Sequence, residues 1–221
     1  MSTGPRQLAL ALGHPESFAR EDFLSGVSNA AALALIECWP QWPNRSVVLT
    51  GPEGSGKSHL AAIWSDAAGA RLVAARALEQ AKVPATLATG ALVIEDLTAG
   101  AFDERALFHV LNLAREQDAF VLLTARMPPA HWRVAIRDLE SRLNALPIVG
   151  LTAPDDALLR ALLVKLFADR QIAVEQTLIS YVATRIERSF AAARAVVGRL
   201  DVEAMRRKRA LTRALAAEIL R

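Results

Sequence analysis

The chain has 221 residues and a mass of 23.9 kDa, with 52% hydrophobic residues, 22% charged residues and a net charge of +3. This composition supplies a sizeable core and excludes global disorder, and no uninterrupted apolar run approaches the roughly 18 residues that a membrane span needs. A lone cysteine, Cys38, excludes an internal disulfide framework, and an N-terminus without the pattern of a secretion signal favours a cytoplasmic protein.

Short apolar runs alternate with helical patterns up to residue 151. Strands are expected at 46–50, 91–95 and 119–124, with weaker candidates at 71–74 and 147–151. Helical spacing fills the segments between them, for example 28–38, 57–67 and 104–117. Strands that alternate with helices predict a parallel sheet covered by helices, which is an α/β fold.

The pattern becomes purely helical after Pro154. Helices are expected from the acidic start at 155–156 and at 175–186, 189–205 and 212–220, the last with Thr212 as its N-cap. The sequence thus predicts three parts: a tail at 1–15, an α/β domain at 16–151 and a small all-α domain at 152–221.

One motif in the α/β domain carries a specific chemistry. Residues 51–58 fit G-x-x-x-x-G-K-[ST], between a strand that ends at Thr50 and a helix that begins at Lys57. Glycines let backbone N–H groups turn toward phosphates, Lys57 would reach the β- and γ-phosphates, and the Ser58 hydroxyl would bind Mg²⁺. A glycine turn followed by a chance Lys-Ser is the alternative. The residues placed at this ATP or ADP site are Gly51, Pro52, Glu53, Gly54, Ser55, Gly56, Lys57, Ser58 and His59.

Polar residues also end two of the expected strands. Glu95 and Asp96 follow one strand and Thr124 ends the next, and ligands of open parallel sheets sit at the carboxyl ends of strands. One carboxylate, assigned to Glu95, would hold Mg²⁺, and Asp96 would orient a hydrolytic water. The Thr124 hydroxyl would bond a γ-phosphate or that water. An ordinary strand exit and a local turn bond are the alternatives.

The order of these parts resembles the AAA+ ATPase core, and more narrowly the DnaA family. The resemblance spans about 16–221 and includes 22–29, similar to the segment that packs beside the adenine, as well as 123–129 and 138–143. It implies a five-stranded parallel sheet followed by an all-α lid domain, with Phe23 at the nucleotide. It also implies that Arg142 is an arginine finger acting in trans and that Arg188 contacts the nucleotide in cis, although Arg185 and Arg194 lie nearby.

The tail adds a second resemblance. Residues 7–12 are similar to the Q-L-x-L-x-L peptide with which the Hda subfamily of DnaA paralogues binds the replicative sliding clamp, so the clamp contacts are assigned to Gln7, Leu8, Leu10 and Leu12. An edge strand or a disordered tail is the alternative. The pair Glu95-Asp96 departs from the Asp-Asp common in the family, which implies weak intrinsic ATP hydrolysis.

These resemblances imply a negative regulator that carries nucleotide, docks on the clamp and stimulates hydrolysis of DnaA-bound ATP. A self-sufficient ATPase, such as a helicase loader or clamp-loader subunit, is the second hypothesis. The third is non-specific DNA binding by 185–213, where nine Lys/Arg stand against three acids, although a solvated helix face explains that segment equally well. Self-association is a further hypothesis, because AAA+ cores meet side by side.

Overall fold

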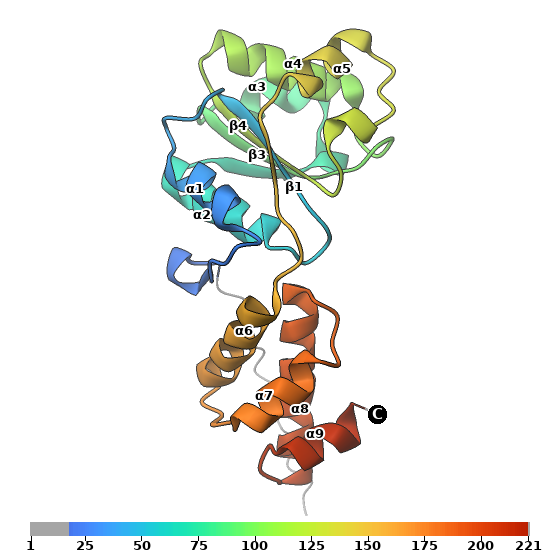
Figure 1. The fold of residues 1–221 in the computed structure, drawn as a ribbon. Coiled ribbons are helices and arrows are strands. Elements are labelled where there is room, and N and C mark those ends of the chain that lie inside the picture. The colour runs from blue at the N-terminus through green and yellow to red at the C-terminus, as the bar shows by residue number, and fades with distance from the viewer. Residues whose placement is uncertain (1–17, 221) are drawn as a thin grey trace, which may run out of the picture. The chain divides into compact units, whose positions relative to one another are not determined.

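The computed structural model describes residues 18–220, which divide into two compact units, 18–155 and 156–220 (Figure 1). The sequence predicts the boundary near 152. In the structure, Thr152 N donates to Ser28 O at 3.1 Å, which ties this stretch to the first unit. None of the helices in 18–220 combines the length and the apolar character that crossing a bilayer requires.

A five-stranded parallel sheet forms the first unit, with strand order β2-β3-β4-β1-β5. Its strands are β1 (Ser46–Thr50), β2 (Arg71–Ala74), β3 (Ala91–Leu97), β4 (Phe120–Ala125) and β5 (Ile148–Gly150). All five expected strands are therefore confirmed, including the two weaker candidates. The central strand β4 lies between β3 and β1, which brings the ends of these three strands to one rim of the sheet.

Alternate residues of the strands build two separate apolar cores, one on each face of the sheet. Val48 and Leu123 belong to the core that contains α4, whereas Val47 and Leu122 belong to the core that contains α1 and α2. Because both faces are covered, β1 is buried along its whole length, which explains its continuous apolar sequence.

Helices cover both faces of this sheet, as Figure 1 shows. The expected helices are confirmed as α1 (Ala30–Glu37), α2 (Lys57–Ala68) and α4 (Glu104–Glu116), the last capped by the Asp103 carboxylate. The sequence reading did not assign α3 (Val83–Thr86), α5 (Arg137–Asn144) or the 3-10 turns η1 (Arg20–Asp22), η2 (Ala75–Ala77), η3 (Gln80–Lys82) and η4 (Pro129–His131). Helix α5 has eight residues and buries only Leu139 and Leu143, so its sequence offers few apolar positions by which to recognise it.

The second unit consists of α6 (Asp156–Asp169), α7 (Gln176–Ala183), α8 (Phe190–Arg207) and α9 (Arg213–Ile219). Helix α6 packs against α7 and α8, and α9 packs against α7 and α8. The predicted N-cap is confirmed, because Thr212 Oγ1 accepts a hydrogen bond from Leu215 N at 3.3 Å. Ser189 caps α8 in the same way through Ala192 N.

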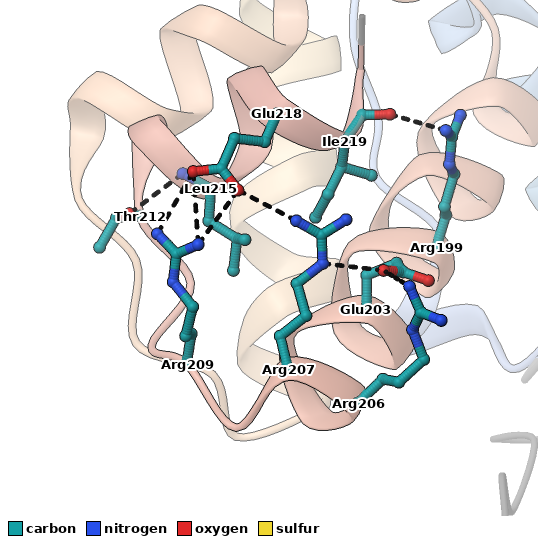
Figure 2. A network of polar contacts seen from close by, with 9 residues as sticks. All are labelled: Arg199, Glu203, Arg206, Arg207, Arg209, Thr212, Leu215, Glu218 and Ile219. Atoms are coloured by element: carbon teal, nitrogen blue, oxygen red, sulfur yellow. Dashed lines mark hydrogen bonds and ion pairs between the residues drawn. The ribbon is translucent and has the colours of Figure 1, made fainter.

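Much of the basic charge near the C-terminus is paired within this unit (Figure 2). Glu218 of α9 accepts from Arg207 and Arg209, and Glu203 of α8 accepts from Arg206 and Arg207. Arg199 donates to the carbonyl oxygen of Ile219 at 2.6 Å. These contacts fasten α9 to the end of α8, so part of the positive segment at 185–213 serves the packing of its own unit.

Candidate functional site

The phosphate loop joins the carboxyl end of β1 to the first residue of α2. Gly51 N donates to Ala125 O at 3.2 Å, and a Cβ at Gly51 would lie 2.5 Å from Leu151 O, so no side chain fits there. Gly54 and Gly56 have φ values of 69° and 99°, which residues with a side chain rarely adopt. The shape of the loop therefore requires its three glycines.

Lys57 is buried beneath this loop. Its Nζ donates to Gly51 O and to Pro52 O, both at 2.8 Å. Burial lowers the pKa of the Lys57 ammonium, and the Asp96 carboxylate acts in the opposite direction. Carbonyl oxygens carry only partial charge, so this ammonium at the start of a helix is placed to pair with an incoming phosphate.

The acidic end of β3 is shaped by a β-bulge. Ile94 pairs with Leu123 and Leu97 with Ala125, so β3 holds one residue more than β4 between these pairs. Asp96 has a φ of 59°, and its amide donates to Thr124 Oγ1 at 3.1 Å. Thr124 is 1% exposed, and its hydroxyl thus holds the bulge that carries the two acids.

Glu95 lies within electrostatic reach of the phosphate loop. Burial raises the pKa of the Glu95 carboxyl, a hydrogen bond with Ser58 opposes the rise, and the Asp96 carboxylate adds to it. Glu95 Oε1 has no hydrogen-bond partner among the described residues although it is buried. A half-buried carboxylate beside a hydroxyl is the donor set that Mg²⁺ takes in phosphate sites.

Arg126 joins this rim, and the sequence reading did not assign it a role. It follows β4 directly, and its Nη2 lies 2.6 Å from Glu53 Oε2 of the phosphate loop. Arg126 also contributes to the lowered pKa of Lys57. The rule that the carboxyl ends of parallel strands share one edge points to Arg126 as directly as to Thr124.

Phe23 lies beside the phosphate loop on another side. A Cβ at Gly56 would contact Phe23 Cε2 at 3.5 Å, and the Phe23 and His59 rings meet edge to face with centroids 5.2 Å apart. His59 Nε2 lies 3.0 Å from Ala19 O. Asn29 shapes the segment because its Oδ1 accepts from Gly26 N and its Nδ2 donates to Leu24 O. An aromatic ring therefore flanks the loop, whereas His59 serves to pack this segment.

Arg142 lies far from these residues, on α5. It lines a pocket with Asn44 and Ser46, which precede and begin β1, whereas the phosphate loop follows the other end of that strand. Five residues of a parallel strand span about 13 Å. The guanidinium of Arg142 stacks over Phe108 with its carbon 5.4 Å from the ring centroid. Arg142 and the phosphate loop thus occupy opposite edges of one sheet.

Two of the expected sites lie outside the described part of the α/β unit. Arg188 belongs to the helical unit, where its Nη2 lies 3.9 Å from Asp156 Oδ1. Arg185 stacks on Tyr181 at 3.7 Å. Gln7, Leu8, Leu10 and Leu12 lie outside the described residues, so the clamp peptide stays a prediction from the sequence.

The residues at the rim fit a nucleoside phosphate with Mg²⁺. Two buried oxygens, Ser55 Oγ and Glu95 Oε1, have no hydrogen-bond partner among the described residues. The hydrogen bonds of the Lys57 ammonium go to two carbonyl oxygens. The loop would hold the phosphates, and Ser58 with Glu95 would hold the ion. A bound nucleotide supplies a phosphoryl group whose transfer such an ion assists.

Several solved structures share this fold. Domain III of the replication initiation protein DnaA from Thermotoga maritima matches with a TM-score of 0.74 at 16% identity, over 92% of this chain and 95% of that chain. AMPPCP-bound DnaA from Aquifex aeolicus matches with a TM-score of 0.70 at 17% identity, over 86% of this chain and 68% of that chain.

The Thermotoga maritima RuvB Holliday junction branch migration motor matches with a TM-score of 0.71 at 17% identity, over 92% of this chain and 71% of that chain. No protein-family model and no curated protein matches the sequence. At these identities the likeness establishes the fold: a parallel five-stranded sheet flanked by helices, as in the AAA+ core, with a helical region after it.

Proposed function

We propose that the chain is an Hda-like paralogue of DnaA that restrains the initiation of chromosomal replication. In this proposal it carries ADP or ATP with Mg²⁺, docks on the sliding clamp, and stimulates hydrolysis of the ATP bound to DnaA. The similarity of its fold to DnaA domain III supports the choice of partner, since AAA+ cores of one kind associate side by side.

The observation that carries this proposal is the position of Arg142. Its guanidinium lies at the edge of the sheet where β1 begins, and its own phosphate loop lies beyond the other end of that strand. A side chain so placed can reach a nucleotide only in a neighbouring molecule. An arginine finger supplied in trans stabilises charge on the transferring phosphoryl group and is worth about 10³–10⁵ in rate.

The chain's own nucleotide has a structural role in this proposal. Lys57, Ser58 and Glu95 would hold it, and Phe23 would flank it, while Arg188 of the helical unit would contact it in cis. A ligand that touches residues of both units favours one arrangement of them over others, because it can bind only where its contacts coincide. The docking face presented to DnaA would thereby depend on the bound nucleotide.

The tail is the proposed clamp contact. Alternating leucines at 8, 10 and 12 in an extended segment would enter a groove, with Gln7 at its polar rim. A pull-down with purified clamp would compare the wild-type chain with Gln7→Ala and Leu10→Ala, and both variants are expected to lose binding. Capture of both variants at the wild-type level would refute the clamp contact without bearing on Arg142.

The main test is turnover of DnaA-bound ATP in the presence of clamp loaded on DNA. Wild-type protein should accelerate hydrolysis, and Arg142→Ala should reduce this acceleration about 10³-fold or more. Arg137→Ala is the matched control, because it removes the same charge from an exposed position of the same helix, and it should behave as wild type. Full stimulation by Arg142→Ala would end the proposal.

A second candidate is a self-sufficient ATPase acting as a helicase loader or clamp-loader-like subunit. The proximity of Glu95, Asp96 and Thr124 to the phosphate loop favours it, since these residues could bind Mg²⁺ and orient a water in cis. This candidate predicts appreciable turnover by the protein alone, lost in Lys57→Ala. The regulator predicts slow turnover alone and strong stimulation of DnaA.

A further inference from the structure

A pocket of about 380 Å³ opens at the edge of the sheet where β1 begins, away from the phosphate loop. Leu111, Ala145 and Leu146 supply the apolar part of its lining, and polar side chains from three segments supply the rest. Its size falls within the range of natural small-molecule sites. The lining residues are Asn44, Arg45, Ser46, Leu111, Arg115, Asp118, Arg142, Ala145 and Leu146.

The charges of this pocket are unbalanced. Three of its lining residues are arginines and one is an aspartate. That aspartate, Asp118, is already paired with Arg45. The Arg45 Nε lies 3.1 Å from Asp118 Oδ1, and the Arg45 Nη1 donates to the carbonyl oxygen of Asp118 at 2.8 Å. Arg115 and Arg142 have no carboxylate partner among residues 18–220, and the guanidinium of Arg142 lies over the Phe108 ring. Two guanidinium groups thus line one pocket whose single carboxylate, Asp118, is already paired with Arg45.

The neutral polar groups in the same wall also favour an anion. The Asn44 carboxamide accepts from Ser46 N at 3.2 Å through Oδ1, which leaves its NH₂ group as a donor. Guanidinium groups bind phosphate oxygens through paired N–H donors, and a half-enclosed pocket screens such bonds less than open water does.

We propose that this pocket binds a free phosphate-class oxyanion between Arg115 and Arg142, and that the bound anion holds Arg142 on its own subunit. The site itself follows from the pocket and its charges. Its regulatory consequence rests on the function proposed above, because an Arg142 engaged by a free anion is not available to the phosphates of a neighbouring nucleotide. Free phosphate would then compete with the partner's nucleotide for the same guanidinium.

The binding test titrates the wild-type chain with inorganic phosphate and follows its amide resonances by NMR, because the residues whose resonances shift locate the bound phosphate. Ser46 and Ala145 report on the pocket, and Gly54 and Lys57 report on the phosphate loop, which also attracts phosphate. Saturable shifts at Ser46 and Ala145 are expected. Shifts confined to Gly54 and Lys57 would overturn the proposed site.

Matched variants test the role of the arginine. Arg115→Ala should weaken phosphate binding at the pocket about tenfold or more, because a hydrogen bond to a charged group is lost. Arg105→Ala removes the same charge from an exposed position at the other end of α4 and should bind as wild type. Equal weakening by both variants would show that the lower net charge, and not the loss of a specific contact, weakens phosphate binding, and this would overturn the site.

Regulation is tested separately in the DnaA assay. Added phosphate should lower the stimulation by wild type and by Arg105→Ala, and the same phosphate concentration should inhibit Arg115→Ala less. Binding at the pocket with no loss of stimulation would overturn the competition with Arg142. Full stimulation by Arg142→Ala would instead refute the proposed function, and the phosphate titration would still decide the site.

Discussion

Replacing Thr124 by valine removes one oxygen from the buried end of β4 and keeps the shape of the side chain. The lost hydroxyl is the acceptor for Asp96 N at 3.1 Å. A partly buried amide left without an acceptor costs about 1–3 kcal/mol, and valine creates no cavity that would add to this. A loss near 2 kcal/mol corresponds to a midpoint of thermal unfolding lower by about 4–8 °C for a unit of this size.

Tryptophan fluorescence measures this loss in the correct unit. The four tryptophans are Trp39, Trp42, Trp64 and Trp132, and all belong to the α/β unit. Urea or thermal unfolding followed by their emission therefore reports on the α/β unit. Circular dichroism follows the helices of both units, so the part of its change that does not coincide with the tryptophan emission belongs to the helical unit. The helical unit should unfold unchanged in Thr124→Val.

Thr124→Ser separates the hydroxyl from the methyl group. Serine keeps the acceptor and loses a methyl, so it should lose about 1 kcal/mol and retain slow hydrogen exchange at the Asp96 amide. Thr124→Val should exchange that amide faster. If Thr124→Val lost less than about 0.5 kcal/mol and its Asp96 amide stayed as protected as in wild type, the hydroxyl would not hold the bulge.

Nucleotide binding should take up protons at alkaline pH, because burial lowers the pKa of Lys57 in the free protein and bound phosphates raise it again. Calorimetry in buffers of different ionisation enthalpy measures this uptake, and Lys57→Ala should abolish it while weakening binding about 100-fold. Glu95→Gln should stabilise the α/β unit at about pH 8 and lose this advantage as the pH falls toward about 4. The raised pKa means that only the ionised carboxylate destabilises the folded state, so equal stabilisation at both pH values would contradict burial as the cause. Gly198→Ala should stabilise the helical unit by about 0.5–1 kcal/mol in circular dichroism melts, because this glycine lies inside α8 and a Cβ there meets no atom within 4 Å. No gain would indicate that the alanine is strained.

Strands β1, β3 and β4 were predictable because they are buried along most of their length and therefore have nearly continuous apolar sequences, whereas β2 and β5 are partly exposed and gave the weaker signals. The phosphate loop was predictable because its backbone geometry admits few residue types. Helix α5 was missed because it is eight residues long and its buried face consists of Leu139 and Leu143 alone, which is too short a pattern to distinguish from chance spacing.

The missed parts of the site arise from tertiary contacts. The ion pair between Glu53 and Arg126 joins residues far apart in the chain, and only the parallel pairing of β1 with β4 brings them together. The bulge at Asp96 depends on a hydroxyl from the neighbouring strand. The position of Arg126 after a strand marks it as a residue of this rim, but neither its partner Glu53 nor the bulge at Asp96 can be identified from a local pattern.

Asp96 has two separate roles, one of its backbone and one of its side chain. Its backbone adopts the left-handed region with a φ of 59°, and its carboxylate supplies negative charge near Lys57. Glycine, asparagine and aspartate tolerate that backbone, whereas alanine and glutamate would strain it. Few substitutions are therefore open to evolution at this position, and asparagine is the replacement that removes the charge while leaving the fold of the strand end in place.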